Sequence, residues 1–157
     1  SRVRRQRQMC IRDSNIIGPN QLSKFGMVVP KFIESALNNE NIVIHGDGSQ
    51  SRSFTWVDDV VSYLIKLAEI KAYGEVFNIG QTEEITIKDL AELIIEKTSS
   101  KSKIIYKTHE EIFGKAFDDP KRRTPGIEKI IKFTGIEPSK NIDFMIENII
   151  NHKKTEL

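Results

Sequence analysis

The stretch that decides the fold is N-I-V-I-H-G-D-G-S-Q-S-R-S-F-T-W-V-D-D, residues 41–59. Its β-branched run, Ile42–His45, predicts a short strand, and the Gly-Asp-Gly that follows is typical of a turn. Residues 53–57 alternate and include aromatic side chains, which predicts a second short strand. Asp58 and Asp59 come next, where negative charge favours the N-terminus of a helix. The stretch therefore predicts strand, turn, strand and helix in close succession.

The segments on either side of this stretch show the periodicity of helices. Upstream, apolar residues recur at helical spacing over residues 27–37. Pro30 falls in the first turn of that helix, where its missing N–H does no harm. Downstream, an apolar face recurs from Val60 to Ala68, and Gly74 breaks the helix.

The rest of the chain alternates between short strands and helices. Thr86 with Asp89 resembles a capping box that opens a helix to about residue 98. Thr124 and Pro125 resemble an N-cap followed by proline at the first position of a helix. Strands are also predicted at 75–79, 85–87 and 103–107, a last helix at 142–152, and a loop at 15–21. This mixture places the chain in the α/β class, and because nothing indicates an internal linker we expect one compact unit.

Composition and charge narrow the possible classes of protein. The chain has 157 residues and a formal charge of +2, but residues 1–14 hold five arginines against one aspartate. The remainder has 19 basic and 21 acidic residues, so a nucleic-acid-binding module is disfavoured. No apolar run is long enough to span a membrane, and no secretory signal is evident. Cys10 is the single cysteine, so no internal disulfide is possible. We expect a cytoplasmic protein that binds neither nucleic acid nor membrane.

The basic N-terminal stretch has an explanation outside the fold. A solvated tail and a phosphate-binding arm are two interpretations. A third is stronger: residues 4–13, R-R-Q-R-Q-M-C-I-R-D, back-translate into a common transposase-based sequencing adaptor. We therefore predict that residues 1–14 are adaptor-derived and that the native chain begins near Ser14 or Asn15, in mid-protein. The gene sequence tests this, since different codons would contradict it.

Few residues carry a recognisable catalytic or metal-binding pattern. The sequence contains no G-x-G-x-x-G, no P-loop, no C-x-x-C and no H-E-x-x-H, and its three histidines are scattered. We therefore predict no metal site. Arg52 follows the glycine turn and precedes a strand, where an arginine can bind phosphate bidentately. A surface arginine is the alternative.

A second charged stretch, F-D-D-P-K-R-R-T-P-G-I, spans residues 117–127. Such a run usually forms a solvated loop, here one that caps a helix. The functional interpretation uses Arg122 or Arg123, near the N-terminus of a helix, as a second anchor for an anion.

Four motifs together resemble the extended short-chain dehydrogenase/reductase family of nucleotide-sugar enzymes. Residues 15–19, N-I-I-G-P, match its NxxGP motif, and residues 74–80, G-E-V-F-N-I-G, match its GexxNiG strand. Residues 41–59 resemble its GDGxQxRxFxxVxD segment, and residues 117–127 its DxxxRxPDI segment. The motifs occur in the family's order and cover residues 15 to about 150.

The resemblance implies an N-terminal Rossmann half that binds NAD and a smaller C-terminal part that holds a nucleotide sugar. Residues 15–157 resemble that C-terminal part of an extended Rossmann-type α/β fold. The family's Tyr-x-x-x-Lys pair is absent, because Tyr63, Tyr73 and Tyr106 are not followed by a lysine four residues later. We therefore expect no catalytic residue here, NAD bound mainly by the other half, no turnover by this chain alone and a homodimeric parent. We also expect the chain to be poorly stable by itself.

Motif by motif, the resemblance implies roles for residues around the diphosphate of the substrate. Arg52 and Arg123 would clamp the diphosphate, and Asn15 would contact the substrate near it. Pro19 would shape the loop close to the nicotinamide of the cofactor, and Asp119 would reach the ribose hydroxyls.

The same reasoning implies residues around the nucleotide. Met27 and Val28 would flank it, while Val43, Ile44 and His45 would line the base. The chain departs from the family pattern at residue 126, where glycine replaces the usual aspartate.

Our leading hypothesis is a nucleotide-sugar 4-epimerase, with a UDP-sugar as substrate, because Phe113-Gly114 before the charged stretch resembles epimerase-type members. A UDP-glucuronate decarboxylase, which shares the G-D-G-x-Q-x-R-S-F run, is the alternative, followed by a dTDP-glucose 4,6-dehydratase. A non-catalytic homologue that binds a sugar nucleotide is the alternative of another class.

Overall fold

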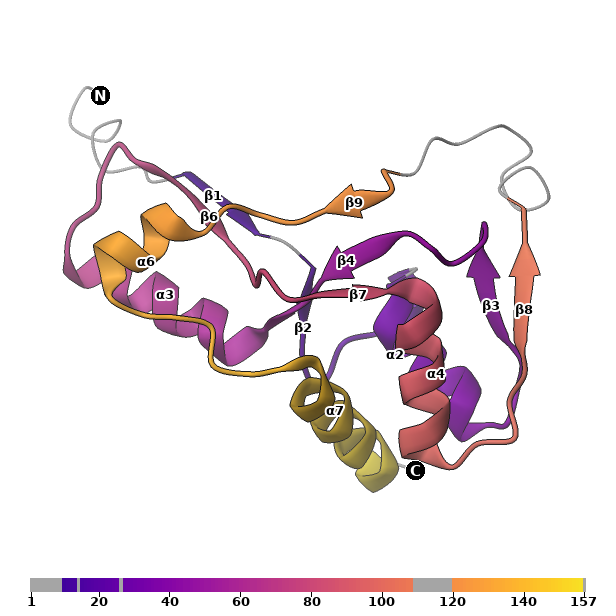
Figure 1. Ribbon diagram of the computed structural model, residues 1–157. Helices are drawn as coiled ribbons and strands as arrows, with labels where there is room; N and C mark the ends of the chain where they lie inside the picture. Colours follow the sequence, from indigo (N-terminus) through magenta and orange to yellow (C-terminus); the bar gives the residue numbers. More distant parts are fainter. Residues whose placement is uncertain (1–9, 14, 26, 109–119, 157) are drawn as a thin grey trace. The chain divides into compact units, whose positions relative to one another are not determined.

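The structure is a computed structural model that describes residues 10–13, 15–25, 27–108 and 120–156 (Figure 1). Its elements are short strands and helices, as expected for the α/β class. The backbone divides into two compact units, not the single unit expected. The first holds the described residues of Ser1–Ile17, Ser53–Glu84 and Thr124–Asn141; the second holds those of Gly18–Arg52, Ile85–Arg123 and Ile142–Leu157. Two of the boundaries between them fall inside short strands, after Arg52 and after Glu84.

The first unit contains two pairs of parallel strands and two helices. Strand β1 (Cys10–Asp13) pairs with β6 (Val76–Ile79), and β2 (Ile16–Ile17) pairs with β5 (Thr55–Trp56). Helices α3 (Val57–Glu69) and α6 (Glu128–Thr134) contact each other, and α6 contacts β6. Their buried side chains form one apolar core: Val60, Tyr63, Leu67, Ala72, Phe77, Ile79, Ile127 and Ile130.

Strand β1 lies within the segment predicted to be adaptor-derived. Its partners run from Cys10↔Val76 to Asp13↔Ile79. A strand ladder is made by backbone groups and does not require particular side chains. The origin of residues 1–14 therefore stays a prediction.

The second unit contains most of the remaining strands. Strand β3 (Ile42–His45) pairs in parallel with β8 (Ile104–Lys107). A three-stranded sheet has β4 (Ser51–Ser53) at its centre, between β7 (Glu84–Thr86) and β9 (Arg122–Arg123) (Figure 1). Of the residues in these strands, Ser53 and Glu84 belong to the first unit.

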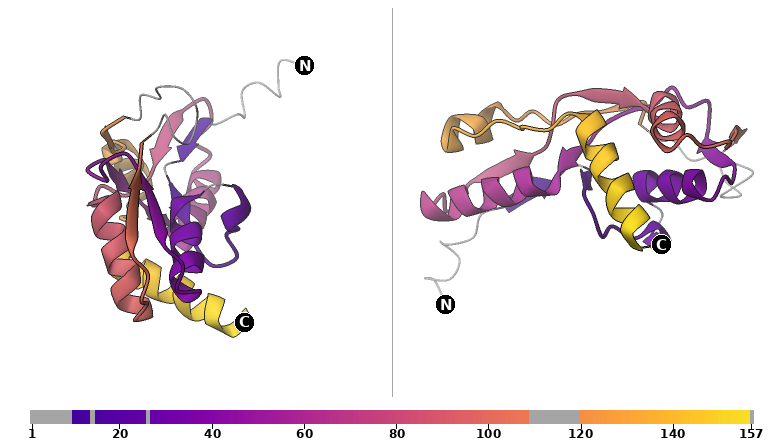
Figure 2. Two further views of the ribbon diagram at one scale, coloured as in Figure 1. Left: turned by 90° about the vertical axis from the view of Figure 1, so that its right-hand side faces the viewer. Right: turned by 90° about the horizontal axis from the view of Figure 1, so that it is seen from below.

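The helices of the second unit pack around an apolar core. They are η1 (Ser23–Phe25), α2 (Val28–Leu37), α4 (Ile87–Thr98) and α7 (Ile142–Glu156). Helices α2 and α4 lie side by side, and both contact β3 and α7 (Figure 2). The core is supplied by residues of these elements that are almost fully buried: Val29, Phe32, Ile33, Ala36, Ile42, Ile44, Leu90, Ala91, Ile94, Met145, Ile146, Ile149 and Ile150.

The two predicted helix caps have different outcomes. Thr86 caps α4 as expected, since the Asp89 amide donates to the Thr86 hydroxyl over 3.0 Å. The cap at Thr124 is wrong: α6 begins at Glu128, and its N-cap residue is Ile127. The Thr124 hydroxyl is instead hydrogen-bonded to the Glu84 carboxylate, and the preceding residues are extended in β9.

The predicted strand at residues 53–57 is also wrong in its extent. Ser53 ends β4, whose partners are β7 and β9, while Thr55 begins β5, whose partner is β2. Phe54 lies between the two strands, and Val57 already starts α3. One apparent alternation therefore covers two short strands with different partners.

Candidate functional site

Arg52 and Arg123 lie on neighbouring parallel strands. Strand β4 pairs with β9 in the register Ser51↔Arg122 and Arg52↔Arg123. Paired residues of adjacent strands project to the same face of a sheet, about 4.8 Å apart along the hydrogen-bonding direction. The sequence left open which arginine of β9 would act with Arg52, and the register pairs Arg52 with Arg123.

The Arg52 side chain is held by backbone carbonyl groups. It is only 8% exposed. Its Nη1 donates to the Ser51 carbonyl over 2.7 Å and to the Pro120 carbonyl over 2.8 Å. A guanidinium has five N–H donors in a fixed planar arrangement, so fixing one nitrogen orients the whole group. Arg123 is exposed, so the pair combines one fixed arginine with one accessible to solvent.

The three β3 residues predicted to line a base do not share one face of the strand. Ile44 is 0% exposed and belongs to the core, together with Ile42. Val43 and His45 alternate with them and are half-buried on the opposite face. The Gln50 side chain donates to the His45 carbonyl over 2.8 Å and holds the end of β3 against the turn.

Met27 and Val28 lie at the start of α2. Met27 is the N-cap residue, is exposed, and makes no side-chain cap. Val28 is half-buried in the first turn, and Pro30 follows in that turn as predicted. The two residues therefore stand at the positive end of the helix dipole, where an anionic group is favoured.

Asn15 and Pro19 flank the short strand β2. Asn15 adopts a left-handed backbone with φ 39°, which asparagine tolerates better than most residues. Its side-chain amide donates to the Ser53 carbonyl over 3.0 Å, and the Thr55 amide donates to the Asn15 carbonyl over 3.2 Å. Pro19 is half-buried in the turn after β2. Asp119 lies outside the described residues.

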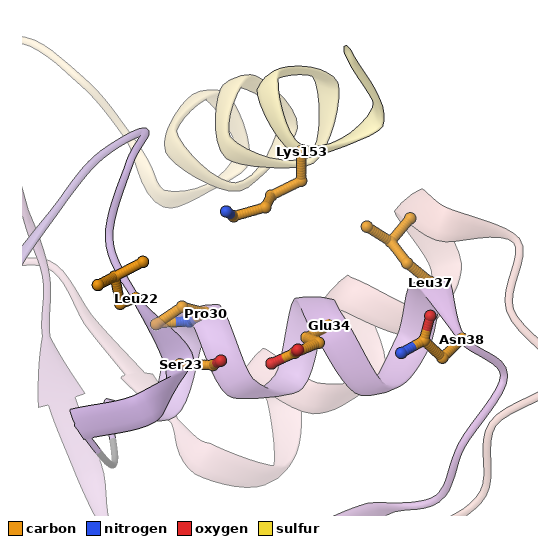
Figure 3. A pocket seen from close by; sticks show the side chains of 7 residues that line it. All are labelled: Leu22, Ser23, Pro30, Glu34, Leu37, Asn38 and Lys153. Atoms are coloured by element: carbon orange, nitrogen blue, oxygen red, sulfur yellow. The ribbon is translucent and has the colours of Figure 1, made fainter. Parts of the chain in front are cut away.

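A cavity of about 330 Å³ in the second unit was not predicted from the sequence (Figure 3). In Figure 3 the side chain of Lys153 extends from α7 into the space above α2. The lining residues come from η1 and its neighbour, α2 and its C-cap, and α7: Leu22, Ser23, Pro30, Glu34, Leu37, Asn38 and Lys153. None of the predicted site residues lines it.

Two kinds of feature are absent from the described part of the chain. It contains no group of three or more His, Cys, Asp or Glu side chains that could hold a metal ion. None of its helices is long and apolar enough to cross a membrane.

Few residues of the chain match the pattern of a dinucleotide-binding site. Its sequence has no glycine-rich phosphate loop, and Pro19 is the one residue for which a contact with a nicotinamide is predicted. These residues do not by themselves fit NAD.

Comparison with known proteins identifies relatives of the chain. A family model described as the NAD dependent epimerase/dehydratase family matches residues 3–80. A UDP-N-acetyl-alpha-D-glucosaminuronate decarboxylase of Bacillus cytotoxicus is 33% identical over 82% of this chain and 40% of its own length. A UDP-glucuronic acid decarboxylase 1 of Danio rerio is 34% identical over 91% of this chain and 32% of its own length.

A solved structure agrees with these matches. The UDP-glucose 4-epimerase of Thermotoga maritima, determined with UDP-glucose, has a TM-score of 0.83 and 29% identity over 94% of this chain and 46% of its own. The Rossmann-type α/β fold class is therefore confirmed. The chain spans less than half the length of these relatives. On these matches and this fold, the chain belongs to the NAD dependent epimerase/dehydratase family.

Proposed function

We propose that the protein binds a UDP-sugar and that Arg52 and Arg123 hold the diphosphate of this substrate. The observation that carries the proposal is the register of β4 and β9, which sets the two arginines side by side on one face. Guanidinium groups match the geometry of phosphate oxygens and bind them bidentately. The carbonyls of Ser51 and Pro120 fix Arg52 before the substrate arrives, which reduces the entropy lost on binding.

The remaining predicted residues have supporting roles in this proposal. Asn15 contacts the substrate near the diphosphate, and Asp119 the ribose. Met27 and Val28 flank the nucleotide, and the positive end of α2 favours the negative charge there. Of the β3 residues, Val43 and His45 share the face opposite the core and are better placed to meet a base than buried Ile44. Pro19 is still proposed to shape the loop close to the nicotinamide of the cofactor.

We infer that the complete protein is an NAD-dependent decarboxylase of a UDP-uronic acid. This inference rests on the curated relatives at 33–36% identity, which are decarboxylases of UDP-glucuronic acid or its N-acetylglucosaminuronate counterpart. In such a reaction the C6 carboxylate leaves as CO2 and a proton takes its place at C5, so that a UDP-hexuronic acid becomes a UDP-pentose. NAD bound to the complete protein would supply the reversible hydride acceptor.

A 4-epimerase of a UDP-sugar is the second candidate, and it was the leading hypothesis from sequence. It is favoured by the similarity to the Thermotoga maritima UDP-glucose 4-epimerase. A dTDP-glucose 4,6-dehydratase from Bacillus anthracis is 24% identical, and that likeness supports the fold alone.

One incubation separates these candidates. The complete protein encoded by the native gene would be mixed with NAD and UDP-glucuronic acid, and the products analysed by mass spectrometry and chromatography. We expect CO2 and a UDP-pentose. Conversion to an isomer of unchanged mass would favour the epimerase. The same incubation would be repeated with UDP-N-acetylglucosaminuronate and with UDP-glucose. If UDP-glucuronic acid binds but none of the three substrates is converted, the result would contradict the decarboxylase and favour a non-catalytic homologue.

A further inference from the structure

A side-chain hydrogen bond joins the two outer strands of the sheet that carries Arg52. The Thr124 hydroxyl donates to Oε1 of Glu84 over 2.5 Å, in a partly buried position. Glu84 is the first residue of β7, and Thr124 directly follows β9. A hydrogen bond this short to a carboxylate is of the strong, charge-assisted kind.

The bond spans the central strand of the sheet. Strand β4 lies between β7 and β9, so the outer strands are about 9–10 Å apart at the usual strand spacing. A glutamate and a threonine reaching toward each other can close that gap. Continuing the β4–β9 register by one residue sets Thr124 opposite Ser53, one step beyond the Arg52↔Arg123 pair.

Strand β9 is very short, so each attachment to it matters. It has two residues, Arg122 and Arg123, and both are exposed. A two-residue strand has few ladder hydrogen bonds and few buried contacts to fix its position. Thr124 is bonded covalently to Arg123. A hydrogen bond that fixes Thr124 therefore also restrains the backbone of Arg123.

We propose that Glu84 is a positioning residue that acts through Thr124 to keep Arg123 in line with Arg52. This inference rests on the proposed role of the two arginines in binding a diphosphate. Glu84 does not touch the substrate. Its carboxylate fixes the end of β9, so that the backbone of Arg123, from which the exposed side chain extends, keeps its position beside Arg52.

The test compares UDP with uridine as probes of the complete protein by isothermal titration calorimetry. Glu84→Gln weakens the acceptor, Thr124→Val removes the hydroxyl at nearly constant shape, and Thr124→Ser keeps it. Exposed Glu83 offers a matched control, Glu83→Gln, with the same change of charge one residue away. We expect Glu84→Gln and Thr124→Val to weaken UDP binding about five- to tenfold. Uridine binding and the Thr124→Ser and Glu83→Gln variants should stay within about twofold of the unmodified protein.

The outcomes separate this inference from the function on which it rests. Unchanged UDP binding in both Glu84→Gln and Thr124→Val, while Arg52→Ala and Arg123→Ala weaken it, would overturn the positioning role and leave the arginine pair intact. Equal losses for UDP and uridine would show a general effect on folding and would also overturn it. If Arg52→Ala and Arg123→Ala both leave UDP binding unchanged, the diphosphate site and the positioning role fail together.

Discussion

Two buried hydroxyl groups have no hydrogen-bond partner among the described residues. They are Oγ of Ser53 and the phenol of Tyr63, and both side chains are 0% exposed. A buried hydroxyl without a partner costs about 1–3 kcal/mol. Burial, followed by the negative charges of Asp59 and Glu137, raises the pKa of Tyr63 from 10.0 to about 12.

Tyr63→Phe should therefore leave the free energy of unfolding unchanged or raise it by up to about 1 kcal/mol near neutral pH. The variant should also change the response to alkali. Between pH 10 and 12 the unfolded chain loses the phenolic proton while the folded protein keeps it, so stability falls as pH rises. The phenylalanine variant has no phenolic proton and so lacks this part of the pH dependence. Urea denaturation at pH 9 and pH 11 measures the decrease in the free energy of unfolding. An identical decrease in both proteins would contradict the prediction.

At the scale of single residues, the sequence leads to two arginines but not to their surroundings. Arg52 and Arg123 are proposed from their motifs and from the chemistry of phosphate binding, and their role stays a prediction. The Pro120 carbonyl that holds Arg52, and the Thr124 bond to Glu84, depend on strands that pair across long separations in sequence. No local pattern carries that information, which is why Thr124 was misread as a helix cap.

The turn between β3 and β4 shows how one element is fixed by its residue types. Oδ1 of Asp47 accepts hydrogen bonds from the Ser49 hydroxyl over 2.7 Å and the Ser49 amide over 2.9 Å, and these bonds lower the pKa of Asp47. Gly48 has φ +77°, and a Cβ there would lie 3.2 Å from Cβ of Lys88. The turn therefore requires glycine for both its backbone conformation and its packing.

Gly48→Ala should destabilise the protein by about 1–3 kcal/mol, through backbone strain and a close contact with α4. Gly74→Ala is the matched control, because Gly74 has φ +79° but nothing within 4 Å of an added Cβ. The free energy of unfolding of the control should fall only because of its strained backbone conformation, by about 1 kcal/mol. Chemical denaturation of both variants measures the difference, and equal losses would show that the packing argument is wrong.

The elements themselves were predictable where the pattern is long. Helix α2 begins one residue inside the predicted range, because its apolar periodicity is clear. Helix α4 ends at Thr98 as predicted, and a threonine cap defines its start. The strand Ile42–His45 has the predicted bounds. Strands β2 and β9 have two residues each, too few to show any alternation, so they were missed.

At the scale of the whole molecule, the segments of the two units alternate along the sequence, and apolar surface is exposed. Each unit is assembled from three separate segments, which a search for linkers does not reveal. On α3, Val61, Leu64 and Ile65 are 45%, 38% and 57% exposed, although the opposite face of the helix is buried. Apolar side chains grouped in this way usually pack against a further part of a protein.

The chain produced by itself should therefore be only weakly stable. Its apolar α3 face is exposed, and its relatives are more than twice as long. We expect a broad thermal transition at low temperature by circular dichroism, with aggregation on heating. A cooperative transition at high temperature would contradict this expectation.

The measurement that tests the central claim most directly is the affinity of the complete protein for UDP after each arginine is replaced. Arg122→Ala is the control, because Arg122 is adjacent on β9 but pairs with Ser51 instead of Arg52. Isothermal titration calorimetry should show that Arg52→Ala and Arg123→Ala each weaken UDP binding by about 1–3 kcal/mol, while Arg122→Ala has little effect. Unchanged binding in both Arg52→Ala and Arg123→Ala would contradict the account.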